Sequence, residues 1–250
     1  MMSRRINTED LTSEHLQAAF LQFKQMRNQS HARCLSWEHC IEQFSFVFDK
    51  LNTKELKVEN IQDDLIDTLC LHLGFYLASW GMMRGSTDLL DYDYKIHTKA
   101  VKHLLSYPEL FRMYSDTLCK EENLDKLEKL CTELQNAYTV EQERPFNNEN
   151  VSNILITKIL MGTLGIVPAY DSFVTEAVKH YNITTANFNT DSFKKLSYYF
   201  ETHLNEEIKN LTKEMQNLFS LYTPMKVLDI LLWYLGKLLT KNKTQEAKKQ

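Results

Sequence analysis

Glycine and proline are scarce in this chain, whose 250 residues include only 6 Gly and 4 Pro. A protein built from β-strands would need many turns at this length, and turns depend heavily on these two residues. The sequence also has no internal repeat and no low-complexity linker. Few breaks and long elements therefore indicate helices, and a hydrophobic content of 43% is enough for a sizeable core.

Cysteine is present in an odd number, without a CxxC pair and without regular spacing. The five residues are Cys34, Cys40, Cys70, Cys119 and Cys131. This pattern argues against a disulfide framework and favours a reducing compartment, so we expect a cytoplasmic protein. The segment "MMSRRINTEDL" has no apolar stretch of the kind that a secretory signal requires. His31 and His39 lie near two of the cysteines, but the spacing does not fit a zinc site, and we expect neither a metal nor a cofactor.

A strong excess of charge of either sign is also missing, because the formal net charge is -4 and the pI is about 6.1. This charge balance argues against non-specific binding along nucleic acid through an overall positive charge, and it still allows a local basic groove. The most apolar stretch, "LIDTLCLHLGFYLASWGMM", approaches the length of a membrane span but contains Asp67 and His72. We therefore expect a buried core helix there and no membrane partner.

Apolar residues recur at intervals of three and four along most of the chain, which is typical of amphipathic helices. We expect a first helix from about residue 12, a second capped by Ser36 and a third capped by Asn60. Later helices are expected near 97–106, 151–164, 172–181 and 191–222. Thr223 and Pro224 have the residue types of an N-cap and a first helical position before a final helix. The pattern predicts an all-α globule of about eight to ten helices.

The most polar and loop-like segment is "VEQERPFNNEN", residues 140–150. It interrupts the helical pattern, and we expect two helical lobes with a cleft between them. The expected lobes are residues 1–139 and 151–240, joined by the polar connection 140–150. Residues 241–250, "KNKTQEAKKQ", are basic and polar, which predicts a frayed tail.

A lysine interrupts the apolar face of the expected helix "VSNILITKILMGTL". On a helical wheel Lys158 falls among the apolar residues of that face and not opposite them. Its neighbours on the wheel are Val151, Ile154, Leu155 and Gly162. An amine held in an apolar cleft loses hydration, which disfavours its charged form and makes it a candidate nucleophile. The alternative is a lysine whose stem covers apolar surface while its charge reaches water.

An acid follows thirteen residues later, in the decapeptide "GIVPAYDSFV". Asp171 directly precedes the expected helix "SFVTEAVKHY", so it fits the N-cap of that helix. In a cleft, the same carboxylate would counter the charge of Lys158 or take up a proton. The two roles are compatible, because a capping carboxylate keeps one oxygen free to face a ligand.

The segment "PAYDSFV" resembles the part of the helix-hairpin-helix DNA glycosylases in which an apolar run leads to Asp, then to Ser or Thr, at a helix start. The resemblance implies that Asp171 is the catalytic acid, which stabilises positive charge on the sugar as the base departs, and that Lys158 is an assisting amine. It also implies a helical enzyme whose partner is DNA with modified bases. Some divergent glycosylases excise modified bases from phage DNA, which adds phage defence as a biological setting.

The sequence departs from that family's pattern at three points. The segment "NNENVSNILITK" stands where the namesake hairpin should precede the helix, the interval from Lys to Asp is short, and there is no four-cysteine iron–sulfur motif. In addition, "SWEHC", "LASWGMMRGS", "TKILMGTLGIVPAYD" and "PMKVLD" together are similar to a set of bacterial proteins, and that broader resemblance carries little functional information.

A base that leaves the DNA stack needs a pocket whose side chains replace its lost stacking and pairing. The predicted substrate-binding residues are Tyr170, Trp37, His39, Trp80, Arg84 and Ser86. Aromatic rings would form the pocket wall, and the arginine with its neighbouring serine would hold a phosphate or a modified base. Alternatively, the two tryptophans are core residues. Arg84 could likewise interact only with the carbonyl groups at the C-terminal end of its helix.

Two other functions fit parts of the sequence. A non-catalytic helical interaction or regulatory protein agrees with the net negative charge. Arg33 and His39 form an R-x5-H arrangement that resembles the active-site motif of HEPN-type helical ribonucleases, in which arginine stabilises phosphate charge and histidine moves protons. The glycosylase hypothesis is favoured because Lys158 and Asp171 are two unusual features of one short segment.

Overall fold

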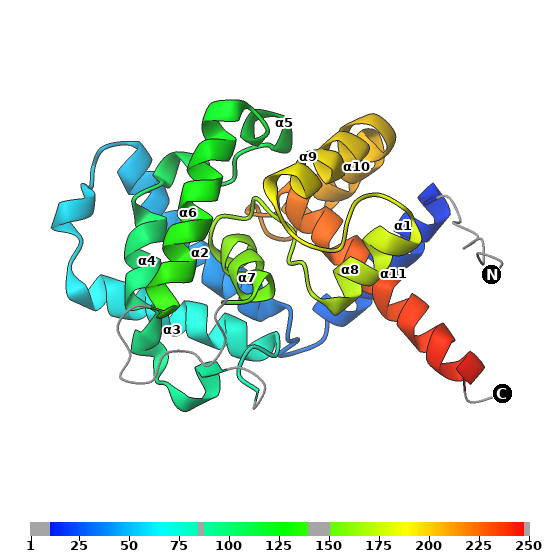
Figure 1. Cartoon of the computed structure of the whole chain (residues 1–250), viewed down its shortest axis with the longest axis horizontal. Coiled ribbons are helices and arrows are strands. Elements are labelled where there is room, and N and C mark those ends of the chain that lie inside the picture. The colour runs from blue at the N-terminus through cyan, green and yellow to red at the C-terminus, as the bar shows by residue number, and fades with distance from the viewer. Residues whose placement is uncertain (1–10, 85–87, 140–150, 248–250) are drawn as a thin grey trace, which may run out of the picture.

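The computed structural model describes residues 11–84, 88–139 and 151–247, which form helices and loops and contain no strand (Figure 1). Ten of the described α-helices have eight residues or more, which confirms the predicted all-α globule. The α-helices are α1 (Ser13–Arg27), α2 (Leu35–Asn52), α3 (Asp63–Ser79), α4 (Thr98–Leu105), α5 (Ser115–Leu118), α6 (Glu121–Thr139), α7 (Asn153–Thr163), α8 (Ser172–His180), α9 (Thr190–Tyr199), α10 (Asn205–Gln216) and α11 (Pro224–Ala247).

Three helix starts follow the signals in the sequence. The hydroxyl of Thr12 accepts the backbone N–H of His15 at the start of α1. Asp171 is the N-cap of α8, as predicted. The hydroxyl of Thr223 accepts the backbone N–H of Lys226 at 3.1 Å in the first turn of α11. Each of these bonds satisfies a donor that an uncapped helix would leave unpaired.

Two other predicted caps are wrong. Ser36 lies inside α2, because the helix has already begun at Leu35 and the serine hydroxyl donates to the carbonyl of Arg33 at 2.8 Å. Asn60 ends a short 3₁₀ turn, and α3 starts only at Asp63, so Asn60 precedes the helix by too many residues to cap it. Ser36 lies two residues after the N-cap position of α2, which is Cys34, and Asn60 lies two residues before that of α3, which is Gln62.

The helix predicted at 191–222 is shorter and less regular than expected. α9 leads into a π-helical turn at Phe200–Leu204, and α10 then ends at Gln216. A π-helical turn accommodates an extra residue within a helix, a feature that apolar periodicity alone does not predict.

The final helix, α11, continues to Ala247 and so includes the first part of the expected tail. The fraying of residues 241–250 stays a prediction. An ion pair between Lys243 and Glu176 of α8 holds the later turns of α11 against the rest of the protein.

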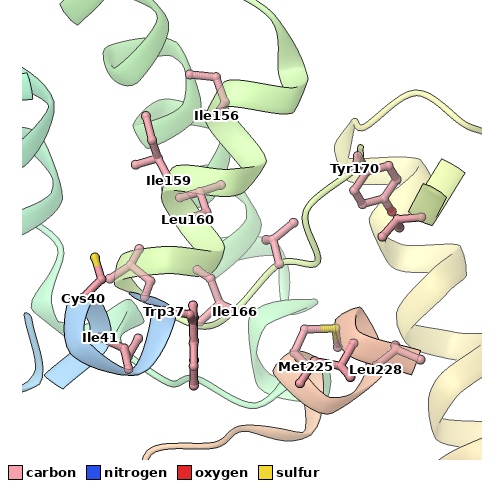
Figure 2. Close-up of a cluster of buried hydrophobic side chains, with 14 of the residues drawn as sticks. Trp37, Cys40, Ile41, Ile156, Ile159, Leu160, Ile166, Tyr170, Met225 and Leu228 are labelled. Carbon is pink, nitrogen blue, oxygen red and sulfur yellow. The ribbon is translucent and has the colours of Figure 1, made fainter. Parts of the chain in front are cut away.

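α7 lies at the centre of the molecule and packs against α2 and α3, while α11 packs against α8, α1 and α10 (Figure 1). Figure 2 shows the buried cluster where three of these helices meet, with Trp37 and Ile41 of α2, Ile159 of α7 and Leu228 of α11. Residues before and after the polar connection thus share one hydrophobic core. The connection itself, 140–150, lies outside the described residues, and the division into two lobes stays a prediction.

The most apolar stretch of the sequence forms α3 and the turn after it. Leu69, Leu73 and Leu77 are completely buried, as expected of a core helix, whereas Leu71 and Phe75 on the opposite face are half exposed or more. The helix therefore has one buried face and one face that is partly exposed. None of the helices in the described ranges is long and apolar enough to cross a membrane.

α8 and α11 approach each other more closely than side chains would allow. A Cβ atom added to Gly236 of α11 would lie 1.8 Å from the backbone oxygen of Phe173 in α8. No rotamer change relieves a clash with a backbone atom, so only glycine fits at this crossing. Because Phe173 is two residues beyond Asp171, the crossing also fixes the position of that acid.

Candidate active site

Lys158 and Asp171 lie next to each other in the folded protein. The Nζ atom of Lys158 is 3.8 Å from Oδ2 of Asp171, and the two side chains are 6% and 14% exposed. α7 carries the lysine, and the acid stands at the start of α8. The chain between them returns along α7, where the hydroxyl of Thr157 accepts the backbone N–H of Tyr170 at 3.0 Å. The structure therefore brings together the two residues that the sequence singled out.

The amine of Lys158 ends inside the protein. It donates to the backbone carbonyl of Trp80 at 2.6 Å. The alternative in which the lysine extends its charge into bulk water is therefore wrong. Burial is the largest influence on Lys158 and lowers its pKa, while the carboxylates of Asp171 and Asp229 act in the opposite direction and Arg33 adds to the lowering.

The two carboxylate oxygens of Asp171 have different partners. Oδ1 accepts the backbone N–H groups of Phe173 at 3.0 Å and Val174 at 3.1 Å, which is the N-cap of α8. Oδ2 is the oxygen nearest Lys158. Burial raises the pKa of Asp171, and the charge of Lys158 and the two amides counter that rise. Asp171 thus caps a helix with one oxygen and faces a cationic side chain with the other.

Two hollows meet at this pair of residues. The outer cleft has a volume of about 500 Å³ and the inner cavity one of about 20 Å³, which is room for about one water molecule. Trp80, Lys158, Asp171 and Trp233 line both hollows. The acid and the amine therefore lie where the two hollows join, and the larger one has the size of a small-molecule site.

A second buried ion pair lines the inner cavity. On α11, Nζ of Lys226 lies 2.8 Å from Oδ2 of Asp229, and the side chains are 6% and 9% exposed. Oδ1 of Asp229 accepts the backbone N–H of Ala169 at 2.9 Å, two residues before Asp171. Lys226 also lies over the ring of Trp37, 4.9 Å from its centroid. This pair fixes the segment that carries the acid.

Sequence reasoning missed the second pair, although a signal was present. "PMKVLDILLW" places Lys226 and Asp229 three residues apart in a run that is otherwise apolar. Side chains three apart lie on one face of a helix, and charged groups in an apolar run are buried as pairs more often than alone.

Two of the predicted substrate-binding residues line the outer cleft. Trp80 lines the cleft and its carbonyl accepts from Lys158, and Arg84 lies in the turn that follows α3. The guanidinium of Arg84 lies against Gly81, where an added Cβ atom would be 2.7 Å from one of its nitrogens. Ser86 lies outside the described residues.

The other predicted residues line neither hollow. Trp37 is a core residue whose Nε1 donates to the carbonyl of Met161 at 2.9 Å (Figure 2). Tyr170 is buried against Phe188, with ring centroids 5.3 Å apart, because successive residues of an extended segment point to opposite sides and its neighbours Ala169 and Asp171 face the cavity.

His39 is exposed on α2 and does not line either hollow. Arg33 does line the outer cleft, so the two members of the R-x5-H arrangement do not face a common site. Sequence reasoning considered Arg33 only as a partner of His39, and it did not select Trp233.

Among the described residues there is no group of three or more His, Cys, Asp or Glu side chains placed to hold a metal ion. Comparisons of the chain with models of protein families, with curated proteins and with solved structures gave no match. The interpretation of the site therefore depends on its own geometry.

Proposed function

We propose that this protein is a DNA N-glycosylase-like enzyme that excises a modified base. One observation carries the proposal: a partly buried carboxylate, Asp171, lies 3.8 Å from a buried amine, Lys158, and both line a cleft of about 500 Å³. Protein clefts of this size bind small organic groups, and a flipped nucleotide is such a group. The resemblance of "PAYDSFV" to the glycosylase segment assigns the same two residues.

The proposed reaction is hydrolysis of the bond between the base and C1′ of the sugar. As that bond breaks, its electron pair leaves with the base and positive charge develops on the sugar, where a nearby carboxylate stabilises it. A water oxygen then bonds to C1′ and gives a proton to the carboxylate of Asp171, which releases it to solvent, while the departing base takes up one proton from solvent. The products are a free base and an abasic site. Because Oδ1 is held by two amides, Oδ2 is the oxygen that faces the reaction.

Lys158 has two compatible roles in this scheme. As an ammonium it holds the carboxylate of Asp171 in its ionised form. Because burial lowers its pKa, its neutral fraction is larger than that of an exposed lysine, and the neutral amine is a nucleophile. Attack of Nζ on C1′ in place of water would displace the base and join the protein to the sugar.

The aromatic and cationic residues of the outer cleft suit a base that has left the helix. Trp80 and Trp233 line the cleft, and contact of a base with aromatic rings offsets part of the few kcal/mol that unstacking costs. Arg33 and Arg84 place positive charge in the same cleft, although the chain as a whole has a net charge of -4. A local basic site within an acidic protein is consistent with a DNA partner.

The proposal is tested by incubating the purified protein with DNA that carries modified bases and with unmodified DNA. We expect mass spectrometry to detect free base and a matching amount of abasic sites from at least one modified substrate. Release of no base from any substrate would contradict the proposal and favour a non-catalytic interaction protein. Cleavage of RNA that His39→Ala abolishes would instead support the R-x5-H alternative.

A second prediction concerns the pH dependence of base release. Release requires ionised Asp171, so its rate should rise with pH through the pKa of that acid. The charge of Lys158 lowers the pKa of Asp171, and Lys158→Met should therefore move the acidic limb of the pH–rate profile to higher pH. Lys179→Met, which removes an exposed lysine of α8, is the matched control and should leave the limb unchanged.

Borohydride added during the same reaction separates the two roles of the amine. A reduced protein–DNA adduct that is absent in Lys158→Met would assign nucleophilic attack to Lys158, because the sugar and the amine form an imine once the sugar ring opens. Base release without an adduct would assign a purely electrostatic role. If Lys158→Met moved the acidic limb of the pH–rate profile to lower pH, neither the electrostatic nor the nucleophilic role of Lys158 would hold.

A further inference from the structure

Tyr76 reaches the inner cavity from α3 because α7 leaves space for its ring. A Cβ atom added to Gly162 would lie 2.3 Å from Cε1 and 2.6 Å from Cδ1 of Tyr76, so the ring occupies the place of a side chain at that position. Gly162 lies one turn after Lys158 on α7. The tyrosine is 2% exposed and lines the inner cavity together with Lys158 and Asp171.

The hydroxyl group of Tyr76 makes no hydrogen bond to any residue that the structure describes. Two other tyrosines of the cavity wall do have such partners. Tyr222 donates to Oε1 of Glu38 at 2.8 Å, and Tyr234 donates to Sδ of Met26 at 3.2 Å. Tyr76 therefore brings a donor and an acceptor to the cavity that the surrounding protein does not use.

Two carboxylates lie near this hydroxyl. Burial raises the pKa of Tyr76, and the charges of Asp229 and Asp171 raise it further. The hydroxyl therefore keeps its proton at neutral pH and acts as an uncharged hydrogen-bonding group. A buried hydroxyl without a partner costs free energy, and a bound water recovers that cost.

The spacing of Lys158 and Asp171 leaves room for a bridging water. The 3.8 Å between Nζ and Oδ2 is longer than a direct hydrogen bond, and water commonly connects polar atoms at such a separation. One N–H of the ammonium donates to the carbonyl of Trp80, so two others remain. The inner cavity, about 20 Å³, has room for about one water, and a hydroxyl, an ammonium and a carboxylate give it three partners.

We propose that the inner cavity binds one water molecule between Tyr76, Lys158 and Asp171, and that this water is the nucleophile of base release. The second part rests on the proposed function. The water oxygen bonds to C1′ while the bond from C1′ to the base breaks, and the base keeps the electron pair of that bond. One proton of the water passes to Oδ2 of Asp171 and from there to solvent, and the base takes up a proton from solvent.

A crystal structure at high resolution tests the water site without any substrate. We expect electron density for one water within about 3 Å of both the Tyr76 hydroxyl and Oδ2 of Asp171. In Tyr76→Phe, which keeps the ring and loses the hydroxyl, this water should be absent. A cavity without water in the wild-type protein would overturn the site, and so would a water that keeps its place in Tyr76→Phe.

Kinetics test whether this water reacts. Tyr76→Phe should lower kcat of base release by about 10-fold, because one hydrogen bond to the nucleophile is lost, and should change KM by less than about 2-fold. Tyr107→Phe is the matched control. It removes another buried tyrosine hydroxyl, which donates to Oε2 of Glu133 at 3.0 Å, and it lines neither hollow. An unchanged kcat in Tyr76→Phe, or equal losses in the two variants, would contradict the proposal.

Aqueous methanol tests where the nucleophile comes from. The inner cavity has room for a water but not for the larger methanol, so the product should be the abasic site without a methyl group on its C1′ oxygen. A methyl glycoside formed in proportion to the methanol content would show that the nucleophile enters from bulk solvent. Trapping of most turnovers by borohydride as an adduct of Lys158 would show that the amine attacks in place of this water.

The water site and the proposed function fail separately. If the water is present but no substrate releases a base, the site stands, and the proposed function fails together with the role of the water in it. If base release occurs in a protein whose inner cavity holds no water, the function stands and the water site fails.

Discussion

Asp171→Asn is expected to reduce base release by roughly 10²- to 10⁴-fold and to leave the fold intact. The amide oxygen of asparagine can still accept the N–H groups of Phe173 and Val174, and asparagine is as good an N-cap as aspartate. What the variant loses is the negative charge beside the sugar. The rate of base release and the midpoint of thermal unfolding, measured on the same preparation, test both parts of this expectation.

A second N-cap separates capping from catalysis. Asn189 caps α9 by accepting the backbone N–H of Ser192 at 2.7 Å, and it lies outside the outer cleft. Asn189→Ala should lower the free energy of unfolding by about 1 kcal/mol and leave base release unchanged. The assignment of Asp171 as the acid would be wrong if Asp171→Asn retained base release, or if both variants lost it to the same extent.

Asp229→Ala is expected to destabilise the protein by about 3–5 kcal/mol, the largest change in stability that we predict. The substitution leaves the ammonium of Lys226 buried without a countercharge, and the backbone N–H of Ala169 loses its acceptor. Both groups would have to find water or move. Urea denaturation, followed by circular dichroism, measures the change in the free energy of unfolding.

A double replacement tests whether the pair acts as a unit. Lys226→Met combined with Asp229→Leu removes both charges and keeps similar volumes, so it should recover most of the stability that Asp229→Ala loses. Asp229 also raises the pKa of Asp171, and its removal should move the acidic limb of base release to lower pH. A loss below about 1 kcal/mol in Asp229→Ala would show that the pair does not stabilise the segment before Asp171.

The sequence predicted the helices well because their determinants are local. Apolar spacing indicates a buried face, and a residue such as Asp171 or Thr223 satisfies the first N–H groups of a helix within three residues. Lys158 was found for a related reason, because a charge among apolar residues conflicts with the pattern around it. That conflict indicated a special environment, which the structure places at the junction of two hollows.

The remaining parts of the site depend on contacts between distant segments. Arg33, Trp80 and Trp233 come from three separate parts of the chain. The spacing of apolar residues cannot predict that the arginine will stack on the two tryptophan rings. It also cannot say which aromatic residues of an apolar face meet a cavity. Trp37 and Tyr170 were therefore predicted as pocket residues although both belong to the core.

The close approach of the α8 and α11 backbones at Gly236 determines which side of the site can move when a ligand binds. Since the backbones of α8 and α11 touch there, Asp171, Asp229 and Trp233 belong to a single stiff unit. We therefore expect a nucleotide that widens the outer cleft to displace Arg33, Trp80 and the turn after α3, which line its other side. Asp171 would keep its position on α8 while the side chains of Arg33 and Trp80 move.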